Sequence, residues 1–327
     1  MALVAGAALL IPTLIPTLIP TLFPRAIGGV QAAGQQPTFR AGIDLVNFGV
    51  TVTDKKGGFI DDLTVDDFEI VEDGKKQTPT YFARGDQATS APPLHIGLLF
   101  DTSGSMGEDI KLARSAAVRF LNTLSDAVDM TLVDFDTEVR VAQYGPVDMP
   151  RLVERIRGRR ANGWTSLYDA LGIYLDGAHD MDGRKVLVLY TDGGDTRSAQ
   201  TFADVQAMLK SSDVIVYAIG FMEHQPIQVR NEQKMRLQQL ADITGGEAYF
   251  PATNKALDQV FQRIVSQVRA QYSLGFISTD GKRDGTWRKL DVRLTGSHLQ
   301  NLQIRTRKGY YAAYSDLPAV GKPGSQN

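Results

Sequence analysis

Two short apolar runs, far apart in the chain, constrain its fold more than any other feature of the sequence. Leu94–Phe100 and Lys185–Tyr190 consist mainly of apolar residues and lack the alternation of a strand that faces water on one side. Segments with apolar residues at helical spacing follow them. Short apolar strands that alternate with helices predict a parallel sheet covered on both faces. We therefore expect an α/β fold, with a doubly wound, mostly parallel sheet, over residues 94–270.

The segments on either side of this domain have the patterns of antiparallel strands. Residues 38–88 contain alternating stretches and a hairpin signal at Asp73-Gly74, and alternation returns over residues 271–314. Each segment has too few strands to bury an apolar face alone. We expect the two to pair as one antiparallel β-sandwich in which the α/β domain is inserted; the alternative is two separate β units that flank it. Residues 315–327 are expected to be disordered.

The N-terminal segment is uncharged and repetitive. Residues 1–24 contain a proline every four residues, from Pro12 to Pro24. Prolines at this spacing disrupt helical hydrogen bonding, which argues against an integral membrane span. An apolar stretch followed by small residues around Val30-Gln31-Ala32 is typical of a secretory signal. We interpret residues 1–33 as a signal-peptide-like segment and expect an exported bacterial protein, periplasmic or extracellular.

Composition excludes several classes of site. The chain has no cysteine, so it has neither disulfides nor thiolate metal sites. Its four histidines are far apart, and none has a paired metal-binding spacing. A net charge of −2 provides no global field that would recruit nucleic acid or an anionic membrane. Phosphate-binding GxxxxGK[ST] and nucleophile-elbow GxSxG motifs are absent from the sequence.

Oxygen-bearing side chains follow the predicted strands where a parallel sheet binds its ligands. Asp101, Ser103 and Ser105 form a DxSxS motif directly after the first apolar run. Thr165 precedes a predicted helix, and Asp192 directly follows the second apolar run. Each motif alone is explained by a helix cap or a turn. Their occurrence together at one edge of the sheet predicts a metal site.

The chemistry of these five side chains indicates which ion would bind. All are oxygen ligands, which favour Mg²⁺, or Mn²⁺ or Ca²⁺, over zinc. Because the hydroxyl groups are neutral, the charge of the ion is incompletely compensated and attracts a carboxylate from outside. We therefore expect a protein partner that presents an Asp or Glu side chain. Met106, Trp164 and Asp195 are the candidate partner-binding residues at the rim.

Residues 94–270 resemble a von Willebrand factor type A (VWFA) domain, which has a Rossmann-like fold. "DTSGSM", "GWTSLYDAL" and "VLYTDGGDT" match the family's metal-ion-dependent adhesion site in order and context. The resemblance implies that Ser103 and Ser105 ligate Mg²⁺ directly and that Thr165 does so when a ligand is bound. It also implies that Asp101 and Asp192 act directly or through water.

A second resemblance extends over about residues 38–314, to the bacterial VWFA-related acidobacterial domain proteins. It rests on "GVTVTDKKGGFIDDLTVDDFEIVEDGKKQ" before the domain and on "GTWRKLDVRL" and "RTRKGYYA" after it.

These observations predict an exported, non-enzymatic adhesion or protein-interaction protein. A phosphatase-like use of Asp101 as nucleophile needs a second carboxylate two residues later, where Ser103 stands. The alternative is a nucleic-acid-binding or intracellular scaffold protein of the type A class that uses the basic stretch Arg151–Arg160. Glu154 interrupts that stretch and no aromatic residues interleave with it, so we expect no nucleic acid and interpret the stretch as a solvated helix face.

Overall fold

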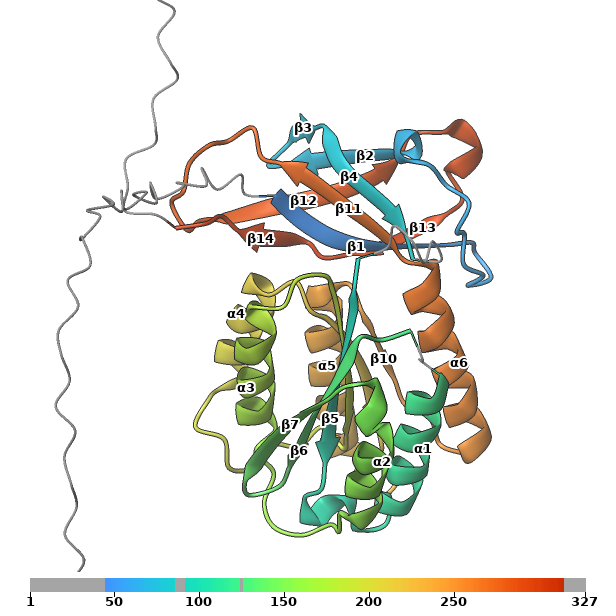
Figure 1. The fold of residues 1–327 in the computed structure, drawn as a ribbon, viewed down its shortest axis with the longest axis vertical. Helices are drawn as coiled ribbons and strands as arrows, with labels where there is room; N and C mark the ends of the chain where they lie inside the picture. Colours follow the sequence, from blue (N-terminus) through green and yellow to red (C-terminus); the bar gives the residue numbers. More distant parts are fainter. Residues whose placement is uncertain (1–44, 86–91, 124–125, 315–327) are drawn as a thin grey trace, which may run out of the picture. The chain divides into compact units, whose positions relative to one another are not determined.

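The computed structural model describes residues 45–85, 92–123 and 126–314. The predicted signal-peptide-like segment 1–33 and the predicted disordered tail 315–327 lie outside these residues. The described residues form an α/β domain and a β-sandwich (Figure 1). No helix within the described ranges is both long and apolar enough to cross a membrane.

A single sheet forms the centre of the α/β domain. Its strands in the described chain are β5 (Leu94–Asp101), β6 (Asp129–Phe135), β7 (Val139–Tyr144), β8 (Arg184–Thr191), β9 (Ile215–Gly220) and β10 (Glu247–Tyr249). They lie in the order β10-β9-β8-β5-β6-β7, with the two apolar runs, β5 and β8, side by side at the centre. Every neighbouring pair is parallel except β6 and β7. The prediction of a doubly wound, mostly parallel sheet is confirmed.

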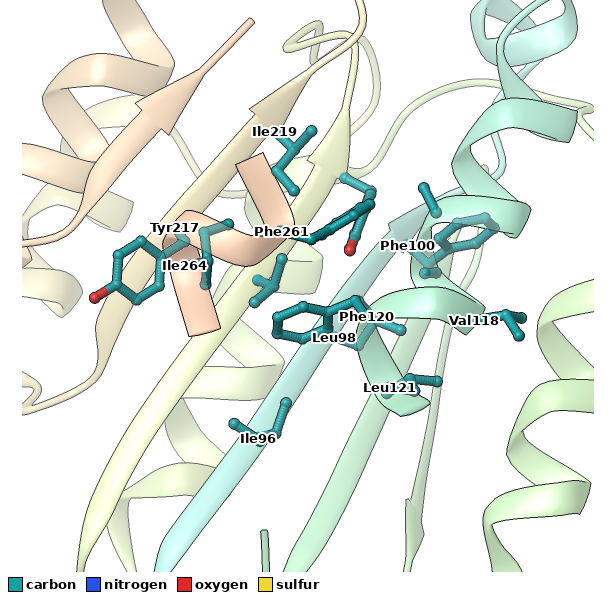
Figure 2. Close-up of a cluster of buried hydrophobic side chains, with 14 of the residues drawn as sticks. Ile96, Leu98, Phe100, Val118, Phe120, Leu121, Tyr217, Ile219, Phe261 and Ile264 are labelled. Atoms are coloured by element: carbon teal, nitrogen blue, oxygen red, sulfur yellow. The ribbon is translucent and has the colours of Figure 1, made fainter. Parts of the chain in front are cut away.

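Helices cover both faces of this sheet. They are α1 (Ile110–Thr123), α2 (Met149–Gly158), α3 (Leu167–His179), α4 (Phe202–Ser211), α5 (Ile227–Thr244) and α6 (Asn254–Ala270). One buried cluster joins the sheet to α1, α2 and α6, and a second joins it to α3, α4 and α5. Figure 2 shows Phe120 of α1 and Phe261 of α6 over the strands that carry Leu98 and Ile219. Burial on both faces explains why the central strands are apolar throughout.

The β-sandwich consists of two antiparallel sheets. Its strands are β1 (Leu45–Thr53), β2 (Phe68–Glu72), β3 (Lys75–Gln77), β4 (Pro79–Arg84), β11 (Tyr272–Ile277), β12 (Trp287–Leu294), β13 (Gln303–Thr306) and β14 (Gly309–Tyr311). β1 pairs with β11 and β13, and β2 pairs with β12. The predicted pairing of the N- and C-terminal segments is therefore confirmed, and the alternative of two separate β units is wrong.

The sandwich core explains this pairing. Side chains from both ends of the chain share one buried cluster, in which Val50 and Ile70 meet Leu274 and Leu290. Neither half contains enough apolar surface to enclose these residues alone. The short 3₁₀ turns of the described chain are η1 (Val65–Asp67), η2 (Gly104–Gly107), η3 (Pro146–Asp148) and η4 (Ser297–Leu299).

The amino end of the parallel sheet adjoins the sandwich. A cleft between them is lined by Phe48 and Ser273 from the sandwich and by Arg184 and Ile215, the first residues of β8 and β9. On the exit side, Gln271 is the one residue between α6 and β11. The carboxyl ends of β5 and β8, and the loops that follow them, are therefore directed away from the sandwich.

Candidate metal centre

The loop after β5 gathers three of the predicted site residues. Asp101 ends the strand with a fully buried carboxylate, whose Oδ1 accepts a 2.8 Å hydrogen bond from the Ser103 backbone N–H. The hydroxyls of Ser103 and Ser105 lie 3.1 Å apart. Ser103 is the N-cap residue of η2, but its side chain makes no capping hydrogen bond. Capping therefore does not account for this serine.

A tight turn presents Thr165. Gly163 has φ of +78°, and a Cβ built there would lie 2.4 Å from Thr137 Oγ1, so this turn requires glycine. The Gly163 carbonyl accepts a 3.0 Å hydrogen bond from Gly104 N–H, which ties this loop to the loop after β5. Thr165 itself is buried, and Ser166, the N-cap residue of α3, makes no side-chain cap.

The loop after β8 completes the arrangement. Thr191 Oγ1 donates to Asp101 Oδ2 at 2.6 Å, which joins the ends of the two central strands. Asp192 is buried, and its Oδ2 accepts a 3.0 Å hydrogen bond from Gln225 Nε2. The same loop returns to Thr165, whose backbone N–H donates to Thr196 Oγ1 at 2.9 Å. All three loops are therefore hydrogen-bonded to one another.

Asp101 and Asp192 place two negative charges in a buried region. Burial, together with the nearby charge of Asp192, raises the pKa of Asp101 to about 7, although hydrogen bonds from Ser103 and Thr191 oppose the shift. The hydrogen-bond partners described for these two carboxylates are backbone N–H groups, hydroxyl groups and one amide, with no ammonium or guanidinium group. No positively charged side chain therefore offsets the charge of these two carboxylates within the described residues.

The donor set fits a hard divalent cation. It consists of two carboxylates and three hydroxyls, all oxygen ligands. Within residues 45–85, 92–123 and 126–314, no group of three or more carboxylate, imidazole or thiol side chains is placed to hold a metal ion. A cation at this edge would therefore depend on hydroxyl ligands, and it would relieve the repulsion between Asp101 and Asp192.

The three predicted rim residues have different surroundings. Trp164 is 62% exposed, so it is available to a partner. Asp195 is partly buried and accepts a 2.6 Å hydrogen bond from Ser198 Oγ. The prediction that Met106 contacts a partner is wrong, because its side chain is fully buried in the core between the sheet and α1. The η2 turn rotates this residue inward.

A buried ion cluster lies beside the site and was not predicted from the sequence. Asp134 of β6 is fully buried and pairs with Phe100 of β5. Its carboxylate accepts hydrogen bonds from Arg140 and Arg155 at 2.7 Å each and from Arg159 at 3.2 Å. The interpretation of the basic stretch as a solvated helix face is therefore wrong for Arg155 and Arg159. The sequence signal for this cluster was Asp134 itself, a carboxylate within a mainly apolar strand, which needs a positively charged partner when it is buried.

Thr102 connects this cluster to the loop after β5. Its hydroxyl donates to the Phe135 carbonyl at 2.9 Å and to Asp136 Oδ2 at 3.4 Å. Asp136 in turn accepts a 2.7 Å hydrogen bond from Arg140. Burial alone would raise the pKa of Asp136, but hydrogen bonds from Arg140 and the Glu138 N–H outweigh it and lower that pKa. Hydrogen bonds to β6 and to the loop that follows it therefore hold Thr102, which lies between Asp101 and Ser103, in place.

Comparisons with known proteins identify one family. The model of the von Willebrand factor type A domain matches residues 95–267. No curated protein matches the chain.

Similar solved structures include a von Willebrand factor type A protein from Catenulispora acidiphila, with 14% identity, a TM-score of 0.46, and coverage of 79% of this chain and 76% of that one. The vWF domain of the type V pili tip protein Mfa5 from Porphyromonas gingivalis has 14% identity, a TM-score of 0.45, and coverage of 54% and 97%. The pilus adhesin SpaC from Lactobacillus rhamnosus GG has 10% identity, a TM-score of 0.46, and coverage of 75% and 47%, so this chain spans about half of it.

Proposed function

This chain belongs to the von Willebrand factor type A domain family, and from that premise we propose that it is a protein-interaction or adhesion protein. It binds a partner's Asp or Glu side chain through a divalent cation held at the carboxyl edge of its α/β sheet. One observation carries the proposal. Asp101 and Asp192 are buried close together, and their described hydrogen-bond partners include no positively charged side chain.

Each residue of the site has a proposed role. Ser103 and Ser105, whose hydroxyls lie 3.1 Å apart, contact the ion directly. Thr165 supplies a third hydroxyl when a ligand is bound, and Asp101 and Asp192 act directly or through water. The ion, Mg²⁺ or alternatively Mn²⁺ or Ca²⁺, supplies positive charge that the partner's carboxylate completes. Trp164, exposed beside Thr165, offers an apolar contact surface around that carboxylate.

The location and the absence of catalysis are part of the same proposal. We propose that residues 1–33 direct export, that the protein acts in the periplasm or outside the cell, and that the resemblance of its flanking segments to acidobacterial VWFA-related proteins reflects a shared architecture. A nucleic-acid-binding role for Arg151–Arg160 has less support. Arg155 and Arg159 are bound to Asp134, and Arg151 pairs with Asp148 at 3.1 Å.

Thermal unfolding with and without divalent metal tests the metal centre. At free Mg²⁺ of about 100 times the dissociation constant, binding adds about 2.7 kcal/mol to the free energy of unfolding. At about 2–4 °C per kcal/mol, the midpoint rises by several degrees over that in EDTA. Ser103→Ala abolishes the rise, whereas the matched variant Ser211→Ala, at an exposed position on α4, retains it. No rise in the wild type with Mg²⁺, Mn²⁺ or Ca²⁺ would refute the metal centre.

The acidic partner is tested separately. A pool of random peptides is passed over immobilised protein in Mg²⁺, and the bound fraction is eluted with EDTA. The eluted fraction is expected to be enriched in Asp and Glu, and the same column made with Ser103→Ala is expected to retain none of it. Equal retention in Mg²⁺ and EDTA would show that the site does not bind partners through a metal.

A further inference from the structure

A groove between α1 and α2 gathers positive charge away from the metal centre. It has a volume of about 500 Å³ and is lined by Lys111, Arg114, Ser115, Val118, Arg119 and Arg157. We propose that this groove binds a small polyanion that carries two or more phosphate or sulfate groups. None of these six residues belongs to the proposed metal centre, so the two sites are independent.

Helical spacing and one hydrogen bond assemble the groove. Lys111, Arg114 and Val118 follow one another at intervals of three and four residues, which places them on one face of α1. Arg114 Nη1 donates to the carbonyl of Arg157 at 2.9 Å, which holds this guanidinium between the two helices. Val118 is buried and forms an apolar floor. The cations are therefore presented together around a defined depression.

The positive charge of the groove is largely uncompensated. Within the described part of the chain, no carboxylate lines the groove and no ion pair is formed by Lys111, Arg114 or Arg157. The Nε of Arg114 is buried and has no hydrogen-bond partner among the described residues. Arg119 pairs with Asp258 at 3.0 Å, and both side chains are about half exposed. Like charges held this close repel one another, so a multivalent anion gains attraction from several side chains at once.

The type of cation and the size of the groove indicate the ligand class. Guanidinium groups bind tetrahedral oxyanions through paired N–H donors, and a lysine adds a point charge. A volume of about 500 Å³ accommodates a small molecule. None of the described residues that line the groove is aromatic, so they offer no stacking surface of the kind with which proteins bind single-stranded nucleic acid. A short chain or ring that bears phosphates or sulfates satisfies all three conditions.

Calorimetric titration of the full chain tests this site. Tripolyphosphate is the probe with several phosphate groups, and sucrose octasulfate is the probe with several sulfate groups. Orthophosphate, which has a single phosphate group, is the reference. EDTA is present throughout, so that the metal centre does not contribute, and ionic strength is held constant. We expect at least one polyanion to bind about tenfold or more tightly than orthophosphate, because it reaches several cations at once.

Matched variants locate the binding. Arg114→Gln with Arg157→Gln is expected to weaken binding of the preferred polyanion by about tenfold or more. Arg151→Gln with Arg160→Gln removes the same charge from α2 and its C-terminal flank, outside the groove, and is expected to change it by less than about twofold. Equal weakening by both pairs would overturn the proposal, because it would show a response to overall charge. Undetectable binding of both probes would also overturn it. Tighter, groove-dependent binding of a single-stranded oligonucleotide would overturn the ligand class.

Discussion

Asp101 and Asp134 are both fully buried aspartates at the carboxyl ends of neighbouring strands, yet their surroundings are opposite. Asp134 receives hydrogen bonds from three guanidinium groups. Asp101 receives them from a backbone N–H and from hydroxyl groups, and the charge of Asp192 raises its pKa. A buried charge is tolerated only when it is compensated. The chain itself compensates Asp134, whereas we propose that a bound cation compensates Asp101.

Removing the compensated charge is expected to have the largest effect. Asp134→Asn leaves Arg140, Arg155 and Arg159 partly buried around a neutral side chain, and we expect the free energy of unfolding to fall by about 3–5 kcal/mol with or without Mg²⁺. Urea denaturation measures this. The surface variant Asp148→Asn serves as the control and changes stability by less than about 1 kcal/mol. A small loss at Asp134 would show that the three arginines are not held by its charge.

Removing the uncompensated charge of Asp101 is expected to have little effect on stability in EDTA. Asp101→Asn abolishes the repulsion from Asp192, so we expect stability within about 1 kcal/mol of the wild type, or slightly above it. The gain of about 2.7 kcal/mol on saturation with Mg²⁺ is lost in the variant. Paired melts in EDTA and Mg²⁺ measure both effects. A loss of several kcal/mol for Asp101→Asn in EDTA would show that the charge of Asp101, like that of Asp134, is already compensated within the protein.

A single arginine of the cluster has an intermediate effect. Arg159→Gln leaves two guanidinium groups on Asp134, and the lost contact is the longest of the three. We expect a loss of about 1–2 kcal/mol in urea denaturation. Arg160→Gln, the adjacent exposed arginine, is the matched control and is expected to be neutral. Equal, negligible effects of both changes would restore the interpretation of Arg159 as a solvated residue.

Thr102 tests whether the two regions influence each other. Thr102→Val keeps the shape of the side chain but removes its hydrogen bonds to the Phe135 carbonyl and Asp136. We expect a loss of about 1 kcal/mol in stability and a several-fold loss of Mg²⁺ affinity, because the loop between Asp101 and Ser103 is less firmly placed. Mg²⁺ titration followed by calorimetry measures the second effect. Unchanged affinity would show that the ion cluster does not position the metal centre.

The fold and the site differ in how far the sequence predicts them. The apolar runs predict β5 and β8 because burial on both faces leaves no position for polar residues, and the position of Asp101 after the first run follows from that. Arg155 and Arg159 are different. Their contact with Asp134 depends on how α2 packs against β6, and no local pattern carries that information. Met106 was misplaced for a similar reason, since the η2 turn changes which side chains face inward.

The insertion of one domain in the other also determines the order in which this protein can assemble. β11 begins at Tyr272, nearly two hundred residues after β4 ends at Arg84. At about 5–20 residues per second, a ribosome needs roughly 10–40 s to synthesise that interval. Until β11 is made, the apolar side chains of β1 and β2, Val50 and Ile70 among them, lack their partners, whereas every strand of the α/β sheet precedes β11 in the chain. Because an unpaired apolar sheet face favours aggregation, we expect the N-terminal strands to need protection until the C-terminal strands pair with them.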